Sequence, residues 1–200
     1  MVSNEQINVN KRNGRGLEAL NIDKIHSMVG FATEGITGVS ASHVEMNSGL
    51  QFFDGISTED IQQILIKSAN DLISLESPNY QYVAARLLLF SLRKSLHHRL
   101  WEHPKFITHI KKLVDLGLYD KGILDNYTEA EIDRMGMWID HERDYSFTYA
   151  GLRQVMDKYL VQDRSTGEIF ETPQFMYMMI SATLFAKYPK ESRLQYVKKY

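Results

Sequence analysis

The stretch VNKRNGRGLEALNIDKIH, Val9–His26, joins a basic, glycine-containing turn directly to an amphipathic pattern. Asn13-Gly14 at its centre is a strong β-hairpin signal, because both central positions of a tight primed turn require positive φ. Short extended runs flank this dipeptide, and apolar residues then recur at helical spacing from Ile22 onward. The stretch therefore predicts a small hairpin that leads into a helix, with Gly35 as the natural stop.

Three further helices are predicted in the first half of the chain. Ser42 is expected to cap one that runs to about Phe53, where an Asp-Gly pair breaks the pattern. STEDIQQILIKSANDLIS predicts the next, capped by Ser57 or Thr58 and followed by acidic residues in its first turn. PNYQYVAARLLLFSLRKSLHHR starts a fourth at Pro78 and is apolar on most of its circumference, which indicates a central position.

The second half is also predicted to be mainly helical. Helical patterns lie near 105–117, 129–139 and 147–157, and KYLVQDRSTGEIFET predicts a second short hairpin about its Ser-Thr-Gly turn. PQFMYMMISATLFAKY is a strongly apolar helix whose methionines and aromatic residues are typical of a core. The fold class is therefore mainly α, with one domain over 1–100 and a second over 101–200.

Composition narrows the classes of function. The chain has 200 residues, 44% of them hydrophobic, and a formal net charge of −2, so no overall field attracts it to nucleic acid or anionic membranes. It has no cysteine, which excludes disulfides, cysteine metal sites and thiol chemistry carried by this chain. No apolar run is long enough to span a bilayer, and the first residues lack an apolar signal core, so we expect a cytoplasmic protein.

Cations gather around the opening hairpin. Lys11, Arg12 and Lys24 can face a polyphosphate at a hairpin and a helix start. The same residues also suit a solvated turn, and NGRG is not a Walker loop, which needs G-x-x-x-x-G-K-[ST]. From the residues alone, both interpretations stand.

Histidines near the middle of the chain raise the question of a metal site. His97 and His98 are adjacent on a predicted helix and therefore point in different directions, and His103 lies within the connection LWEHPKF. No carboxylate lies at a ligand spacing beside them. We therefore expect no metal at these residues.

Two further charged groups have a functional and a structural interpretation. The run IDHERDYSF is either an acid–base cluster or an ion-paired helix terminus; its polar members are Asp140, His141, Glu142 and Asp144. The fourth predicted helix ends in the basic residues Arg93, Lys94 and Arg99. Positive charge there suits the negative end of the helix dipole. Nucleic-acid binding, the functional interpretation, would need more basic residues and exposed aromatics.

The sequence motifs of both halves also follow one another in a recognisable order. VNKRNG, LNIDKIH, FATEGI, FFDGISTEDIQ and YQYVAARLLLFSLRK resemble the ATP-cone of the large subunit of class I ribonucleoside-diphosphate reductase. GLYD, YTEAEID, IDHERDYSFTYAG, KYLVQDRSTGEIFETPQFMYM and YPKESRLQYVKKY resemble the helical region that follows the cone. The resemblance implies a four-helix bundle capped by a small hairpin sheet, then a helical domain truncated before an α/β barrel. Sequences of this kind are similar to bacteriophage reductases.

The resemblance also implies a role for the opening stretch. In this family the cone binds ATP or dATP, with Mg²⁺, as an allosteric effector that controls reduction of ribonucleotides for DNA synthesis. Carried over by position, Lys11 and Lys24 would meet the phosphates, Glu18 and Asn21 the base or sugar edge, and Thr58 and Lys94 would complete the site. The full set of expected effector-binding residues is Lys11, Arg12, Glu18, Ala19, Leu20, Asn21, Ile22, Asp23, Lys24, Thr58, Gln62 and Lys94.

Two departures from the family pattern concern the dATP response more than ATP binding. Members that dATP inhibits commonly have a histidine where this chain has Gln62, one turn into the third helix. The hairpin is also one residue longer here, through Arg15-Gly16. These departures support an alternative in which the chain is an interaction module that binds no nucleotide and associates with a barrel-containing partner.

The absence of cysteine limits the chemistry that the resemblance allows. The family needs a redox-active cysteine pair and a thiyl-radical cysteine in its barrel, so this chain alone should be inactive, and we expect no catalytic residue in it, Lys158 included. The implied partners are the remainder of the large subunit and the radical-generating small subunit, with a homo-oligomer in the full enzyme and no nucleic acid or membrane. A third possibility, an ATP-cone transcriptional regulator, would carry a zinc ribbon, which a chain without cysteine cannot form.

Overall fold

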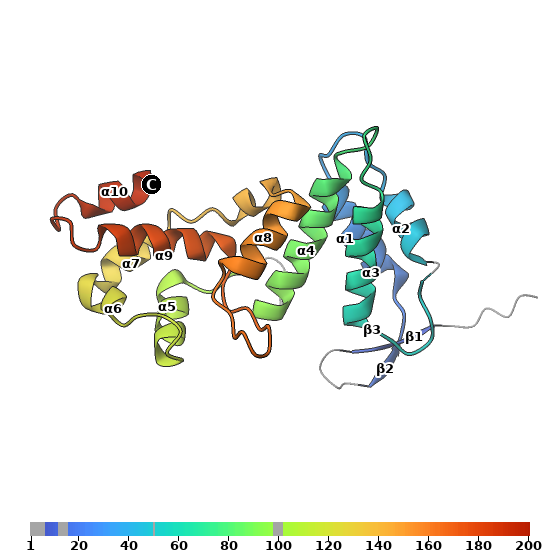
Figure 1. Ribbon diagram of the computed structural model, residues 1–200. Coiled ribbons are helices and arrows are strands. Elements are labelled where there is room, and N and C mark those ends of the chain that lie inside the picture. Colours follow the sequence, from blue (N-terminus) through green and yellow to red (C-terminus); the bar gives the residue numbers. More distant parts are fainter. Residues whose placement is uncertain (1–6, 12–15, 50, 98–101) are drawn as a thin grey trace, which may run out of the picture. The chain divides into compact units, whose positions relative to one another are not determined.

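The protein is mainly helical and carries one small sheet near its N-terminus (Figure 1). The computed structural model describes residues 7–11, 16–49, 51–97 and 102–200. In this part of the chain, no helix combines the length and the apolar character that crossing a membrane requires.

Contacts between Cα atoms divide the chain into two compact units. The first consists of Met1–Ser91 with Tyr145–Leu152, and the second of Leu92–Asp144 with Arg153–Tyr200. The proposed boundary near residue 100 stays a prediction, and the contacts group a short segment of the second half with the first unit.

The sheet of the first unit has three short strands in the order β2-β1-β3. β1 (Asn8–Asn10) pairs antiparallel with β2 (Leu17–Ala19), which confirms the two predicted hairpin strands. On its other side β1 pairs in parallel with β3 (Ile56–Ser57), with Val9 opposite Ile56. Because both of these side chains are buried, the inner face of the sheet closes one end of the helical core.

The sequence did not predict β3, and the hairpin turn at Asn13-Gly14 lies outside the described residues. β3 has two residues, too few for an alternating pattern to be visible in the sequence. Its position is fixed by Asp54, whose Oδ1 accepts hydrogen bonds from the backbone N (2.8 Å) and Nδ2 (3.0 Å) of Asn8.

Three helices and the first part of a fourth, up to Ser91, belong to the first unit. They are α1 (Ile22–Thr33), α2 (Ala41–Gly49), α3 (Thr58–Asp71) and α4 (Tyr80–His97). The Ser57 hydroxyl caps α3 by accepting a hydrogen bond of 2.9 Å from the backbone N of Asp60, as the sequence predicts. α4 is buried on most of its circumference, which confirms its predicted central position.

The predicted bounds of the second helix are wrong. Ser40, not Ser42, precedes the first turn, and its hydroxyl accepts a backbone hydrogen bond of 3.4 Å from His43. The helix ends at Gly49, short of Phe53, because the segment after it is drawn towards β1. Hydroxyl residues occupy both 40 and 42, so the sequence alone could not choose between them.

The remaining elements confirm a mainly helical second half. They are α5 (Phe106–Asp115), α6 (Gly122–Asn126), α7 (Glu129–Gly136), the 3-10 helix η1 (His141–Ser146), α8 (Tyr149–Lys158), α9 (Pro173–Phe185) and α10 (Arg193–Lys199). The predicted second hairpin is reduced to one antiparallel bridge between Gln162 and Ile169, with Gly167 at φ +76° in its turn.

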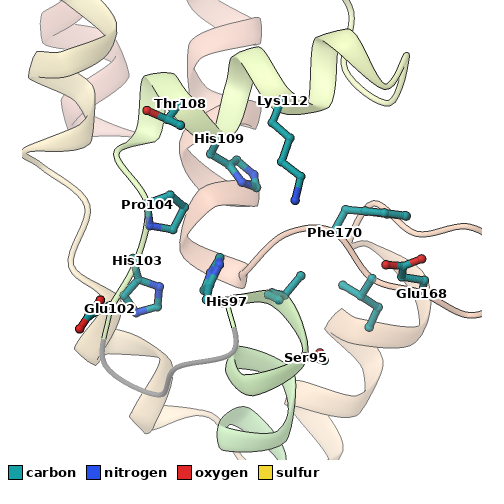
Figure 2. A pocket seen from close by; sticks show the side chains of 12 residues that line it. Ser95, His97, Glu102, His103, Pro104, Thr108, His109, Lys112, Glu168 and Phe170 are labelled. Carbon is teal, nitrogen blue, oxygen red and sulfur yellow. The ribbon is translucent and has the colours of Figure 1, made fainter. Parts of the chain in front are cut away.

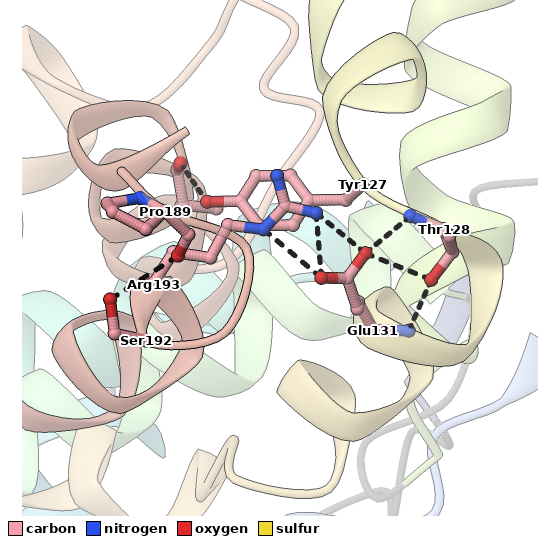
Figure 3. Close-up of polar contacts among 7 residues, drawn as sticks. Tyr127, Thr128, Glu131, Pro189, Ser192 and Arg193 are labelled. Carbon is pink, nitrogen blue, oxygen red and sulfur yellow. Dashed lines mark hydrogen bonds and ion pairs between the residues drawn. The ribbon is translucent and has the colours of Figure 1, made fainter. Parts of the chain in front are cut away.

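A partly buried ion pair joins two helices of the second unit (Figure 3). Nη2 of Arg193 lies 2.7 and 2.8 Å from the two carboxylate oxygens of Glu131, and the guanidinium stacks 4.2 Å from the ring centre of Tyr127. The same carboxylate closes a capping box with Thr128. One arginine therefore fixes α10 against the start of α7.

Candidate functional site

The hairpin brings two of the predicted effector-binding residues into direct contact. The ammonium group of Lys11 forms an ion pair with the carboxylate of Glu18, which lies diagonally across the β1–β2 ladder. The hydrogen bond and charge of Lys11 hold the pKa of Glu18 below its ordinary value, and the charge of Lys24 acts in the same direction. Two cations and one carboxylate therefore share one surface of the first unit.

An open surface hollow adjoins these charges. Its lining is the continuous segment Glu18–Asp23, all of which belongs to the predicted site. Asn21 fixes the path of this segment, because its Oδ1 accepts a hydrogen bond of 3.0 Å from the backbone N of Lys24 and so caps α1. Leu20 adds a backbone hydrogen bond of 2.8 Å to the carbonyl of Ile7.

The start of α3 lies at the same end of the sheet as Lys11. Because β1 and β3 are parallel and Asn10 is opposite Ser57, the residues that follow them, Lys11 and Thr58, emerge at the same end. Thr58 is the first residue of α3, where unpaired N–H groups and the helix dipole favour an anion. The side chain of Asp60 already lies at this helix start, 2.7 Å from the Ser57 hydroxyl.

Gln62, Lys94 and Arg12 complete the list of predicted effector-binding residues. Gln62 is buried, 4% exposed, and its Nε2 donates a hydrogen bond of 3.0 Å to the carbonyl of Leu87 in α4. Lys94 is exposed in the last turn of α4 and belongs to the second unit. Arg12 lies outside the described residues.

His103, His109 and His141 of the second unit pack against other aromatic rings. His103 stacks on His141 with ring centres 3.6 Å apart, and His109 lies 4.4 Å from Phe175. Burial, assisted by neighbouring positive charges, lowers the pKa of His103 to about 3 and that of His141 to about 4. Among the residues that the structure describes, no group of three or more histidines and carboxylates could hold a metal ion.

A pocket of the second unit lies beside these rings (Figure 2). His109 and Lys112, one turn apart on α5, extend towards the same space, and Glu168 lies on the opposite side (Figure 2). The Ser95 hydroxyl at its edge donates a hydrogen bond of 2.8 Å to the carbonyl of Leu92.

Arg93 of the basic helix end and Asp144 of the acidic run meet in one structural joint, and Arg99 lies outside the described residues. Arg93 and Asp144 are both buried and lie 3.4 Å apart, and Gln174 donates a hydrogen bond of 2.9 Å to the same carboxylate. Burial raises the pKa of Asp144, and the contacts with Gln174 and Arg93 offset part of this rise. The interpretation of this run as an ion-paired joint is confirmed.

Comparison with known proteins assigns the two halves of the chain. A model of the ATP cone domain matches residues 7–95, and a model of the all-alpha domain of ribonucleotide reductase matches residues 145–200. The chain is 50% identical to the alpha subunit of ribonucleoside-diphosphate reductase of Haemophilus influenzae and 49% identical to the alpha subunit of ribonucleoside-diphosphate reductase 1 of Escherichia coli, over 98% of this chain and 26% of each relative.

A phage protein is also among the relatives. The alpha subunit of Enterobacteria phage T4 is 43% identical over 96% of this chain and 25% of its own length. The chain thus spans about a quarter of the curated relatives it matches. With its matches to the ATP cone and all-alpha domain models and these relatives, the chain belongs to the family of class I ribonucleoside-diphosphate reductase alpha subunits and corresponds to their N-terminal region.

Proposed function

We propose that the chain is the regulatory part of a reductase alpha subunit and that its first unit binds ATP or dATP as an allosteric effector. The observation that carries this proposal is the grouping of Lys11, Glu18 and Lys24 beside the hollow lined by Glu18–Asp23. A nucleoside triphosphate needs cations for its phosphates and directional polar groups for its base or sugar, and this surface offers both.

The polar groups divide naturally between the parts of the nucleotide. Lys11 and Lys24, with Arg12, neutralise phosphate charge. Asn21 uses its side-chain oxygen to cap α1, so its amide NH₂ remains the group that donates to an acceptor on the base or sugar. Glu18 supplies an acceptor for a donor on the nucleotide, and the exposed side chain of Ile22 offers an apolar surface to the purine.

The remaining residues have supporting roles. Thr58 presents a hydroxyl at the start of α3, where the helix dipole favours phosphate. Gln62 lies behind this surface and supports α3 through its bond to α4. Lys94 is proposed to complete the phosphate contacts from the end of α4.

Mg²⁺ is proposed to arrive with the nucleotide and not in a protein cage. The described residues contain no cluster of three or more histidines and carboxylates suited to a metal. Phosphate oxygens are ligands that Mg²⁺ prefers, and it usually retains several waters. When bound, it neutralises triphosphate charge that the lysines leave uncompensated.

Calorimetry on the 200-residue chain with ATP, dATP and GTP tests the proposal. We expect saturable binding of the adenine nucleotides, weakened at least tenfold by Lys11→Ala combined with Lys94→Ala, because each lost charge-assisted contact costs about 1.5–3 kcal/mol. Lys67→Ala is the matched control, since Lys67 lies on the exposed side of α3 and pairs with Asp71. Absence of adenine-nucleotide binding would overturn the proposal.

The regulated activity is proposed to reside in the rest of the enzyme. This chain has no cysteine and supplies no thiol chemistry, so its effect must reach a catalytic part of the alpha subunit and a radical-generating small subunit, in the cytoplasm. The alternative, an interaction module without nucleotide binding, predicts normal folding but no thermal shift at millimolar ATP.

A further inference from the structure

One helix of the second unit has an unusual outward side. α9 contains no Asp, Glu, Lys or Arg over its whole length, Pro173–Phe185. Three of its large apolar side chains are nevertheless exposed: Tyr177 by 44%, Ile180 by 41% and Leu184 by 54%. Their spacing of three and four residues places them on one side of the helix, and we call them the α9 stripe.

The neighbouring helices show what a water-facing side looks like in this protein. The exposed side of α5 carries Lys111 and Lys112, and that of α7 carries Glu129 and Asp133. These helices follow the usual amphipathic rule, with charge towards water and apolar residues towards the core.

α9 departs from this rule because its exposed side is apolar as well as its buried side. Phe175 and Ala182 are 1% and 0% exposed and belong to the core of the second unit. A helix that is apolar all round is normally covered on all sides. The α9 stripe therefore indicates a second packing surface that the described residues leave open.

We propose that the α9 stripe packs against an apolar, uncharged surface on the part of the reductase alpha subunit outside the quarter that this chain spans. The relatives have about 74% of their length outside the matched region, since the match covers 26% of them. The proposal rests on one part of the proposed function, namely that the chain acts within a reductase alpha subunit. It does not require that the chain binds a nucleotide.

Interface size favours this occupant over a second copy of the chain. A standard stable interface buries about 800 Å² on each partner, far more than three half-exposed side chains supply. A small apolar contact suffices when both surfaces belong to one subunit, because linkage raises their effective concentration into the millimolar range. The α9 stripe fits an intrasubunit contact.

The test uses a full-length subunit in which this chain replaces the matched region of the Escherichia coli relative. Hydroxyl-radical footprinting compares side-chain labelling in this fusion and in the isolated 200-residue chain. We expect strong labelling of Tyr177, Ile180 and Leu184 in the isolated chain and at least threefold protection of all three in the fusion. Leu116, exposed by 55% at the end of α5, should be labelled equally in both.

Charged variants give a second readout. Leu184→Glu should lower the melting temperature of the fusion by several degrees and change that of the isolated chain by less than about 1 °C, because a carboxylate is costly only where it is buried. Leu116→Glu is the control matched in residue type and exposure. If the charged fusion does not fold, footprinting of the unaltered fusion decides.

Three results would overturn the proposal. Equal labelling of the stripe in fusion and isolated chain would show that no other part of the subunit covers it. Protection in the dilute isolated chain would assign the stripe to contacts within this chain, and a concentration-dependent dimer abolished by Leu184→Glu would assign it to a second copy. ATP titration of the isolated Leu184→Glu chain tests the nucleotide proposal separately, because binding should be unchanged whichever result is obtained.

Discussion

Arg93 and Asp144, 51 positions apart in the sequence, form an ion pair in which both side chains are almost fully buried. The guanidinium also donates a hydrogen bond to the carbonyl of His141, and the carboxylate accepts one from Gln174. A buried charge is stable only when it is paired and hydrogen-bonded, so the two residues depend on each other. This pair joins the end of α4 to η1 within the second unit.

Replacing Asp144 should therefore destabilise the second unit. Asp144→Asn keeps the size of the side chain but leaves the buried charge of Arg93 without a carboxylate, at a cost of about 3 kcal/mol. Urea denaturation followed by circular dichroism measures the change. Arg143→Ala is the control, because its pair with Asp140 is exposed and 3.8 Å long and should contribute less than about 0.5 kcal/mol. Equal effects of the two changes would contradict the role assigned to the buried pair.

Stability should fall as the pH is lowered below neutral. Burial lowers the pKa of His103 and His109 to about 3 and that of His141 to about 4, against an ordinary value of 6.5. Between pH 6.5 and 4 the unfolded chain therefore binds more protons than the folded chain, so the free energy of unfolding decreases as pH falls. Each histidine contributes up to about 1.4 kcal/mol per pH unit.

His103→Phe tests this dependence. It keeps an aromatic ring against His141 and removes one titrating group, so the mean slope of unfolding free energy between pH 6.5 and 5 should shrink by about 1 kcal/mol per pH unit. Burial raises the pKa of Glu171, which then takes up a proton in the folded state and offsets part of the loss at the acid end. An unchanged slope in His103→Phe would show that this histidine is protonated in the folded protein.

Gln62 should matter for the stability of the first unit more than for nucleotide binding. Its side chain is 4% exposed and its amide is bonded to Leu87, so Gln62→Leu removes one internal hydrogen bond, at a cost of about 1 kcal/mol. Thermal denaturation and ATP calorimetry are measured on the same variant. A loss of ATP affinity above tenfold at unchanged stability would instead place Gln62 in contact with the nucleotide.

Arg193→Lys should lower the free energy of unfolding, because a positive charge alone does not fix α10 against α7. Lysine keeps the positive charge but cannot form the forked contact with Glu131 or stack in the same way on Tyr127, so the change should cost about 1–2 kcal/mol. Urea denaturation measures it, with Lys111→Arg as the control at an exposed pair with Glu129. A loss no greater than in the control would mean that the fork contributes nothing beyond its charge.

The helices were largely predictable because their information is local. Period-3.6 apolar spacing, the Ser57 cap and the acidic first turn together located α3, and the all-round apolar pattern located α4. The error at α2 has a local cause, since two nearby serines satisfy the same capping chemistry and only the packed chain selects Ser40. For the site, the family resemblance named the segment Glu18–Asp23, which lines a hollow in the structure, and its role in effector binding stays a prediction.

By itself, the sequence determined which faces would be buried, that the chain is mainly helical and cysteine-free, and to which family it belongs. Tertiary structure alone decided the pairing of β1 with β3, the meeting of Arg93 with Asp144 and the inward direction of Gln62. The physical reason is that the spacing of apolar residues along the sequence indicates whether a residue is buried, but not which residue packs against it. A partner about 25 to 50 positions away is selected only when the folded backbone brings it within hydrogen-bond distance.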